Sequence, residues 1–203
     1  MGVLPTPAPP SGRNRASIGE IAITVLLVDD DVAVAKAIRR MLAGHRNIKF
    51  EHCRHAVEAV SRAAELKPTV ILQDLVMPEI HGLTLLRLYQ ADPALRDIPV
   101  IALSADGMDA LKNEAFLRGA SDFLVKLPDP IELTARIRIH SLTRVNQLQK
   151  DEANRALHES QQELMASHQA LADRVAELQY ARDELARLVS TDTLTTLFSR
   201  HRW

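Results

Sequence analysis

Several features that would assign a protein to a common class are scarce in this 203-residue chain. Its single cysteine, Cys53, excludes an internal disulfide and suits a reducing compartment. Aromatic residues make up 3% and the net charge is −1, so nothing argues for a nucleic-acid partner. No apolar stretch approaches the roughly 18 residues that a membrane helix needs, and the N-terminus lacks a secretory signal. These absences favour a cytoplasmic protein without membrane insertion.

Proline and glycine are also absent after Pro130, and their distribution suggests four regions. Residues 1–19 are rich in Pro, Gly and Ser without hydrophobic periodicity, which predicts a disordered tail. Residues 20–142 alternate apolar runs with helical patterns and should form one domain. Residues 143–190 are predicted to form a linker helix, and residues 191–203 to begin a further, incomplete domain.

The apolar runs of the second region predict five strands and the segments between them predict helices. The strands are expected near residues 23–28, 48–53, 69–74, 98–103 and 121–125. The helices are expected near 32–43, 55–66, 82–91 and 107–118, with a fifth starting near 130. Short continuous apolar runs are typical of parallel strands that are buried on both faces. The pattern therefore predicts an α/β fold with a five-stranded, doubly wound parallel sheet.

Polar side chains follow the predicted strands at the points where they end. These residues are Asp29, Asp30, Asp74, Ser104 and Lys126. In an open α/β sheet, ligands bind outside the carboxyl ends of the strands, so one edge should collect three carboxylates, a hydroxyl and an ammonium. That set suits a magnesium-dependent phosphoryl-transfer site with an aspartate as the phosphate acceptor.

Magnesium prefers oxygen ligands in octahedral geometry, and this edge can supply them. Asp30 and Asp74 can provide two carboxylates, and Asp29 can hold a metal-bound water. The backbone carbonyl of Val76, two residues past the expected acceptor, could complete the protein ligands. The metal would offset the repulsion between the acceptor carboxylate and an incoming phosphoryl group.

The remaining polar groups have simple roles in such a site. Lys126 supplies a point positive charge to the phosphate, and Ser104 supplies a hydroxyl donor. Asp31 is most simply a helix N-cap. Taken alone, Asp74, Ser104 or Lys126 would be an ordinary strand-end, turn or surface residue. It is the delivery of matching groups to one edge by three strands that makes coincidence improbable.

The segments VLLVDDD, ILQDLVMPEIHG, IALSAD and DFLVKLP resemble the response-regulator receiver domains of two-component signalling. The resemblance implies that a sensor histidine kinase is the phosphodonor and Asp74 the phosphoacceptor. It further implies Asp29 and Asp30 as the acidic metal pocket, Ser104 as the switch hydroxyl, Lys126 as the site lysine and Phe123 as the switch aromatic.

Two neighbouring positions bear on that resemblance. Ala105 follows the switch hydroxyl, where the family favours a small residue beside the phosphate. The family usually has proline directly after the lysine, often through a cis bond. Here Leu127 intervenes before Pro128, which leaves a cis peptide at this point in question.

The linker region carries a heptad repeat of leucines: Leu157, Leu164, Leu171, Leu178 and Leu185. Such a repeat predicts a coiled coil, and hence a homo-oligomer. If the leucines are d positions, the a positions are Asn154, Gln161, His168, Val175, Arg182 and Val189. Most of these are polar, and polar a residues fix register and oligomeric state at a cost in stability. A solvated helix that folds back on the domain is the alternative.

The motifs ILQDLVMP and VKLPDPIEL resemble the receivers of Wsp-type response regulators, in which a coiled coil leads to a GGDEF diguanylate cyclase domain. The final residues, STDTLTTLFSRHRW, resemble the entry motif D-x-L-T-G-L-x-N-R-R. The matching positions are Asp192, Leu194, Thr195, Leu197 and Arg200, and the departures are Thr196, Ser199 and His201. No GG-[DE]-[DE]-F signature is present. No cyclase activity is therefore expected of these 203 residues, although the parent protein would be a cyclase.

Two functions remain open from the sequence. Phosphorylation of Asp74 could control coiled-coil assembly and so a diguanylate cyclase domain, or the chain could be a stand-alone phospho-switch adaptor that oligomerises and binds a protein partner. A haloacid-dehalogenase-like phosphatase is discarded, because Val76 occupies the place of its second aspartate. A transcription factor is discarded because the leucine heptads occupy the segment after residue 142 without a basic region.

Overall fold

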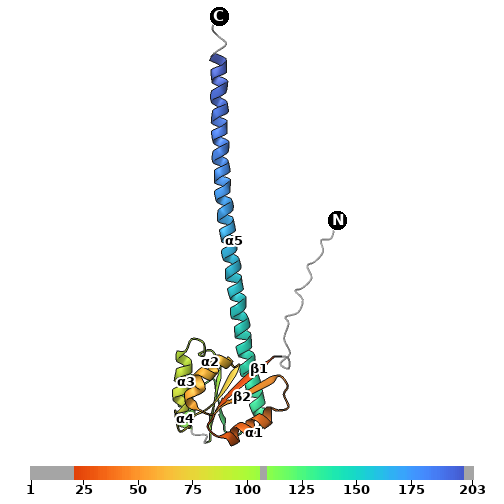
Figure 1. Ribbon diagram of the computed structural model, residues 1–203, viewed down its shortest axis with the longest axis vertical. Helices are drawn as coiled ribbons and strands as arrows, with labels where there is room; N and C mark the ends of the chain where they lie inside the picture. Colours follow the sequence, from red (N-terminus) through yellow and green to blue (C-terminus); the bar gives the residue numbers. More distant parts are fainter. Residues whose placement is uncertain (1–20, 106–108, 199–203) are drawn as a thin grey trace, which may run out of the picture. The chain divides into compact units, whose positions relative to one another are not determined.

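The computed structural model describes residues 21–105 and 109–198, with side chains for residues 21–105 and 110–187 (Figure 1). The chain divides into two compact units between Leu148 and Gln149. The first unit contains a sheet with its helices, and the second is helical. The tail expected over residues 1–19 lies outside the described ranges.

The first unit is built on five parallel strands in the order β2-β1-β3-β4-β5. They are β1 Ile23–Val28, β2 Ile48–Cys53, β3 Val70–Asp74, β4 Val100–Ser104 and β5 Asp122–Val125. The order reverses direction between β1 and β3, and the crevice at such a switch point is where doubly wound sheets bind ligands. The fold class predicted from the apolar runs is therefore confirmed.

Helices connect successive strands, as right-handed crossovers require. The connecting helices are α1 Val32–Leu42, α2 Ala59–Leu66 preceded by the short 3-10 turn η1 Ala56–Glu58, α3 Gly82–Ala91 and α4 Asp109–Leu117, and α5 Pro130–Phe198 follows the last strand. Asp31 caps α1 by accepting a hydrogen bond from the Ala33 amide at 2.7 Å, as the sequence predicted.

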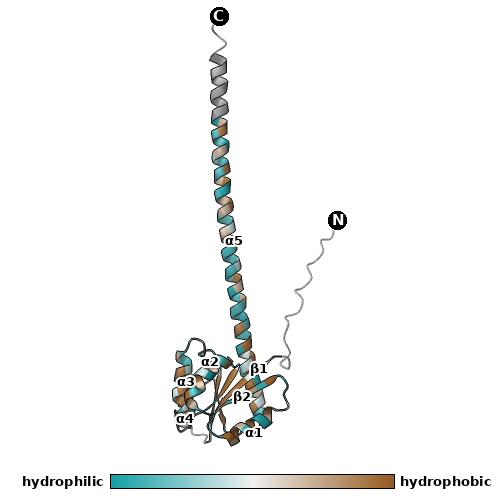
Figure 2. Cartoon of the chain, viewed as in Figure 1, coloured by the Kyte–Doolittle hydropathy of each residue, from teal (hydrophilic) through white to brown (hydrophobic). Residues whose placement is uncertain are grey.

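Each face of the sheet packs into its own apolar core. On β1, Leu26 and Val28 belong to one core, while Val25 and Leu27 belong to the other. The first core takes residues from α2, α3 and α4, and the second takes residues from α1 and the start of α5. Figure 2 shows the strands as the hydrophobic centre of this unit. Burial on both faces explains why the central strands β1, β3 and β4 have nearly continuous apolar runs, whereas the edge strand β2 alternates.

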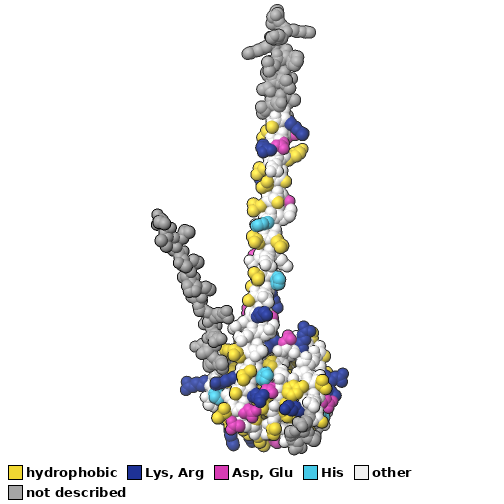
Figure 3. Space-filling view, turned by 180° about the vertical axis from the view of Figure 1, so that it is seen from behind, with side chains coloured by type: hydrophobic (Ala, Val, Ile, Leu, Met, Phe, Trp, Pro, Cys, Tyr) yellow, Lys and Arg dark blue, Asp and Glu magenta, His cyan; other side chains and the backbone are white. Residues whose placement is uncertain are grey.

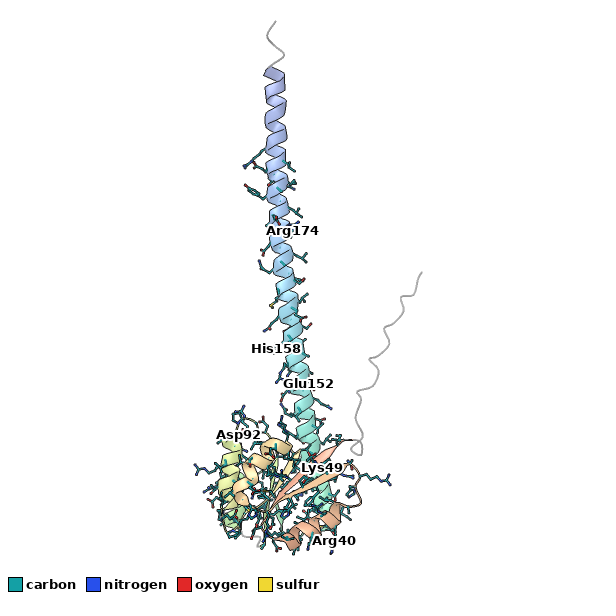
Figure 4. All side chains as sticks on the ribbon, viewed as in Figure 1. Arg40, Lys49, Asp92, Glu152, His158 and Arg174 are labelled. Carbon is teal, nitrogen blue, oxygen red and sulfur yellow. The ribbon has the colours of Figure 1, made fainter. Side chains whose placement is uncertain are left out.

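Helix α5 differs along its length. Leu133 and Ile137 are fully buried in the first unit, whereas side chains from Gln149 to Arg187 are exposed. The heptad leucines of this exposed segment have exposed fractions of 56% (Leu157), 58% (Leu164), 62% (Leu171), 60% (Leu178) and 63% (Leu185). Figure 3 shows hydrophobic side chains along it among charged and histidine side chains, and Figure 4 labels Glu152, His158 and Arg174, which project from it.

The helical backbone of α5 continues to Phe198, past the limit expected at residue 190. The side chains that carry the GGDEF-like entry motif, residues 191–203, lie outside the described ones. None of the helices in the described ranges is both long and apolar enough to cross a membrane.

Candidate functional site

The first acidic residue of the candidate site is held in place by the loop that follows β1. Asp29 is fully buried, and its Oδ1 accepts a hydrogen bond from the Asp31 amide at 2.8 Å. The Asp29 carbonyl accepts one from His52 Nε2 on β2, also at 2.8 Å. The amide of Asp29 bonds to the Cys53 carbonyl at 3.2 Å, so both its backbone groups are tied to the end of β2.

Asp74, the last residue of β3, is fully buried and is held at both carboxylate oxygens. Its Oδ1 accepts a hydrogen bond from the Val76 amide at 3.1 Å. Its Oδ2 accepts one from Lys126 Nζ at 2.8 Å. The same ammonium lies 3.2 Å from Asp29 Oδ2, so one lysine bridges two buried carboxylates. Lys126 is placed there by β5, which ends one residue earlier.

The three carboxylates form a compact oxygen cluster. Asp29, Asp30 and Asp74 each offer one oxygen, and these atoms lie within 4.8 Å of one another. Among the described residues, Asp29 Oδ2 is buried and has the ion pair with Lys126 Nζ at 3.2 Å, an ammonium that it shares with Asp74, but no further donor. A buried carboxylate oxygen without a hydrogen bond is costly unless a cation satisfies it. The all-oxygen donor set and this oxygen together fit a hard divalent cation such as Mg²⁺.

The pKa values of Asp29 and Lys126 are both raised in this cluster. The pKa of Asp29 is raised, mainly by burial and also by the negative charge of Asp74, against the opposing hydrogen bond from Asp31. Burial acts to lower the pKa of Lys126, but the hydrogen bond and charge of Asp74 and the charge of Asp29 outweigh it and raise the pKa. Lys126 therefore stays an ammonium. Its single positive charge does not balance the three acidic side chains of the cluster.

The other predicted site residues occupy the same region of the fold. Ser104 is buried at the last position of β4, and its carbonyl accepts a hydrogen bond from the Lys126 amide at 2.7 Å. Val76 is 62% exposed in the loop after β3. Phe123 is half-buried in β5 and packs against the core on the α2–α4 side. The structure thus brings Asp29, Asp30, Asp74 and Lys126 together at this edge, while Phe123 lies further back along its strand.

The chain leaves the site through an unusual backbone conformation. Leu127 has φ +54°, in the left-handed region that a branched side chain rarely adopts. The peptide bonds around Leu127 and Pro128 are trans, which settles the question that the inserted leucine raised. A left-handed residue here, rather than a cis bond, turns the chain from β5 toward α5.

Two residues that support the site were not identified from the sequence. His52 was counted only as part of a strand, although it anchors the Asp29 carbonyl. Gly82 was counted only as the start of a helix, but a Cβ at this position would lie 2.1 Å from the Asp74 carbonyl oxygen. In the sequence, only the glycine eight residues after Asp74 could have indicated that the backbone comes this close to the Asp74 carbonyl.

Comparison with known proteins agrees with this geometry. Residues 25–138, more than half of the chain, match the model of the response regulator receiver domain. Response regulator Rre1 of Synechocystis is 30% identical over 116 residues, which are 57% of this chain and 50% of Rre1. Response regulator PleD of Caulobacter vibrioides is 34% identical over 136 residues, 64% of this chain and 29% of PleD. The chain thus spans about half the length of Rre1 and a smaller share of PleD.

Solved structures give the same result for the first unit. A response regulator from Chloroflexus aurantiacus superposes with a TM-score of 0.56 at 29% identity, covering 59% of this chain and 98% of that one. The receiver domain of a histidine kinase from Syntrophus aciditrophicus superposes with a TM-score of 0.55, also at 29% identity, covering 60% and 92%. From its buried acids, its bridging lysine and these matches, the chain belongs to the response regulator receiver family.

Proposed function

We propose that Asp74 is the phosphoacceptor of this receiver and that a sensor histidine kinase is the phosphodonor. The observation that carries the proposal is the contact of 2.8 Å between Asp74 Oδ2 and Lys126 Nζ, beside two further acidic side chains. An Asp74 oxygen forms the new bond to phosphorus as the bond to the leaving nitrogen or oxygen breaks. The leaving group keeps that electron pair and takes a proton from solvent.

The surrounding residues prepare Asp74 for this reaction. Lys126 is already within hydrogen-bond distance of the acceptor and places its charge where the phosphoryl oxygens arrive. Ser104, at the end of the neighbouring strand β4, supplies a hydroxyl donor to the same group. Asp29, Asp30, Asp74 and the Val76 carbonyl would hold Mg²⁺, whose charge offsets repulsion between the carboxylate and the phosphoryl group.

The acceptor assignment can be tested with a small phosphodonor such as acetyl phosphate in the presence of Mg²⁺. Intact-mass spectrometry should show one added phosphoryl group on the wild type and none on Asp74→Asn, which is nearly isosteric. Asp31→Asn is the matched control, because Asp31 caps α1 and asparagine caps a helix equally well. A phosphorylated Asp74→Asn variant, or loss of phosphorylation in Asp31→Asn, would contradict the assignment.

We further propose that the exposed segment of α5 pairs with a second copy and transmits the signal to a diguanylate cyclase domain. The support is the row of heptad leucines, each more than half exposed, and the GGDEF-like residues that follow them. Each buried leucine would contribute roughly 1.5–3 kcal/mol, from which the polar a positions subtract. The result is a marginal assembly that a phospho-signal of about 1–3 kcal/mol can bias.

Sedimentation equilibrium with and without beryllium fluoride and Mg²⁺ tests this assembly. The wild type should associate more strongly with the phosphate mimic, and Gln161→Ile with His168→Ile should associate equally in both conditions. A wild type that stays monomeric in both would contradict the coiled-coil switch. Cyclic di-GMP production from GTP is expected only when the downstream reading frame is included, and its absence there would favour the adaptor function.

A further inference from the structure

A glutamine occupies an apolar core directly beside the proposed phosphoacceptor. Gln73 precedes Asp74 on β3 and is fully buried. Its neighbours on the same face of the strand, Ile71 and Leu75, belong to the core covered by α2, α3 and α4. An amide in such surroundings is costly unless both of its ends are hydrogen-bonded.

Both ends of the Gln73 amide do have partners. Its Nε2 donates to the Asp74 carbonyl at 2.8 Å, and its Oε1 accepts from Tyr89 Oη at 2.9 Å. The carbonyl can only accept, so the amide nitrogen must face it and the amide oxygen must face Tyr89. Tyr89 is fully buried on α3, and burial raises the pKa of its phenol, so the hydroxyl remains a donor. A continuous hydrogen-bonded chain therefore joins α3 to the backbone of Asp74.

The peptide that this chain reaches is fixed from several sides. The pairing of β1 with β3 ends at Val28 and Gln73, so the Asp74 carbonyl lies past that ladder. On its other side, the first residue of α3, Gly82, approaches this oxygen so closely that only glycine fits. The Leu75 amide bonds to the Leu103 carbonyl of β4 at 3.1 Å. Gln73 is the side chain that completes this enclosure of the Asp74–Leu75 peptide.

We propose that Gln73 and Tyr89 are positioning residues for phosphoryl transfer to Asp74. By holding the Asp74–Leu75 peptide, they fix the direction of the Asp74 carboxylate and of the loop that carries Val76. They also tie the position of α3 to that of the acceptor through one hydrogen-bonded pair. This inference rests on the proposed function of Asp74 and adds two residues that do not touch the phosphoryl group.

Three variants separate positioning from packing. Gln73→Leu removes the donor to Asp74 and leaves the Tyr89 hydroxyl unpaired. Tyr89→Phe keeps the hydrogen bond from Gln73 Nε2 to the Asp74 carbonyl but leaves Gln73 Oε1 without its donor. The double variant replaces both side chains with apolar ones of similar shape, so the Tyr89 hydroxyl is no longer left unpaired. The Asp74 carbonyl still lacks the donor that Gln73 gave it, so the melting temperature should recover only in part.

The rate of phosphorylation by acetyl phosphate should rank these variants differently from their melting temperatures. A small misplacement of a reacting group slows a reaction by one to two orders of magnitude, so we expect a loss of about 10-fold in Gln73→Leu. The double variant should be as slow as Gln73→Leu although its melting temperature is higher, and Tyr89→Phe should be slowed less. Ile101→Val, in the core on the opposite face, is the control: it lowers the melting temperature and leaves the rate unchanged.

The outcomes distinguish the positioning role of Gln73 and Tyr89 from the proposed phosphoacceptor role of Asp74. A wild type that is not phosphorylated at Asp74 would overturn the proposed function itself. A wild type that is phosphorylated, together with Gln73→Leu at the same rate, would overturn only the positioning role. Recovery of both rate and melting temperature in the double variant would likewise show that the pair serves core packing alone.

Discussion

At the two ends of the receiver sheet, the pKa values of two aspartates, the buried Asp29 and the half-buried Asp122, shift in opposite directions. At the carboxyl end, burial and the charge of Asp74 raise the pKa of Asp29. At the amino end, burial acts to raise the pKa of Asp122, but hydrogen bonds from His140 and Arg136 outweigh it and lower the pKa. One end thus concentrates negative charge at a cost in stability, while the other neutralises it. The difference separates the end of the sheet that carries the candidate site from the end that anchors α5.

The anchoring end is a network of paired groups. Arg136 Nη1 donates to both oxygens of Asp122 at 2.9 and 2.8 Å, and His140 Nε2 lies 3.1 Å from Oδ2. The hydroxyls of Thr69 and Ser141 are 2.9 Å apart, which adds a contact between the start of β3 and α5. These contacts position α5 on the sheet independently of the candidate site.

The largest difference between the two ends should appear with alanine in place of glycine. In Gly82→Ala the new Cβ meets the Asp74 carbonyl at 2.1 Å, so stability should fall by about 3 kcal/mol. Gly44, in the turn after α1 at the amino end, has no atom within 4 Å of a new Cβ. Gly44→Ala should therefore change stability by less than about 0.5 kcal/mol. Urea unfolding of both variants measures the contrast, and equal effects would remove it.

Next in size is the loss of the anchor. Asp122→Asn should destabilise the receiver by about 1.5–3 kcal/mol, since charge-assisted hydrogen bonds to Arg136 and His140 are lost. Because the pKa of Asp122 is lowered on folding, its contribution is present above its ordinary value of 3.8 and is lost as pH falls through its folded value. The variant should lack that acid-induced loss. An unchanged pH profile of unfolding would contradict this account.

Asp29→Asn should have the opposite sign. Its raised pKa means that the folded protein binds the proton more tightly, so stability falls as pH rises from 3.8 through the folded pKa. Removing the charge should raise stability at pH 7 by about 0.5–2 kcal/mol. It should also weaken the rise in melting temperature that we expect millimolar Mg²⁺ to give the wild type. Destabilisation at pH 7 would show that the ionised Asp29 is well satisfied by Lys126.

The smallest effect concerns the strained exit from the site. Leu127→Gly removes the steric cost of φ +54° and should stabilise the fold by up to about 1 kcal/mol. Lys67, at φ +48° after α2, is the matched control, because it has the same conformation at the amino end. If glycine helps at Lys67 and not at Leu127, the conformation at the site is held by contacts of the leucine side chain.

The sequence predicted those features that depend on a single strand. The apolar runs and the polar residues at their ends depend only on burial and chain direction, so Asp74, Ser104 and Lys126 could be placed on one edge in advance. The bond between Gln73 and Tyr89 could not be foreseen, because it depends on how α3 packs against β3. The contrast between Asp29 and Asp122 also needed coordinates, since burial and neighbours decide the direction of each pKa shift.

The burial of Tyr89 gives the receiver an intrinsic spectroscopic probe of its packing. The chain has two tyrosines and one tryptophan, and of these only Tyr89 belongs to the first unit. Tyr89 is fully buried, whereas Tyr180 on α5 is 75% exposed. A fixed phenol in an asymmetric core gives a near-ultraviolet circular dichroism band, which vanishes when packing is lost. A nitrating reagent should mark Tyr180 and spare Tyr89, so a spectroscopist can follow receiver packing without adding a probe.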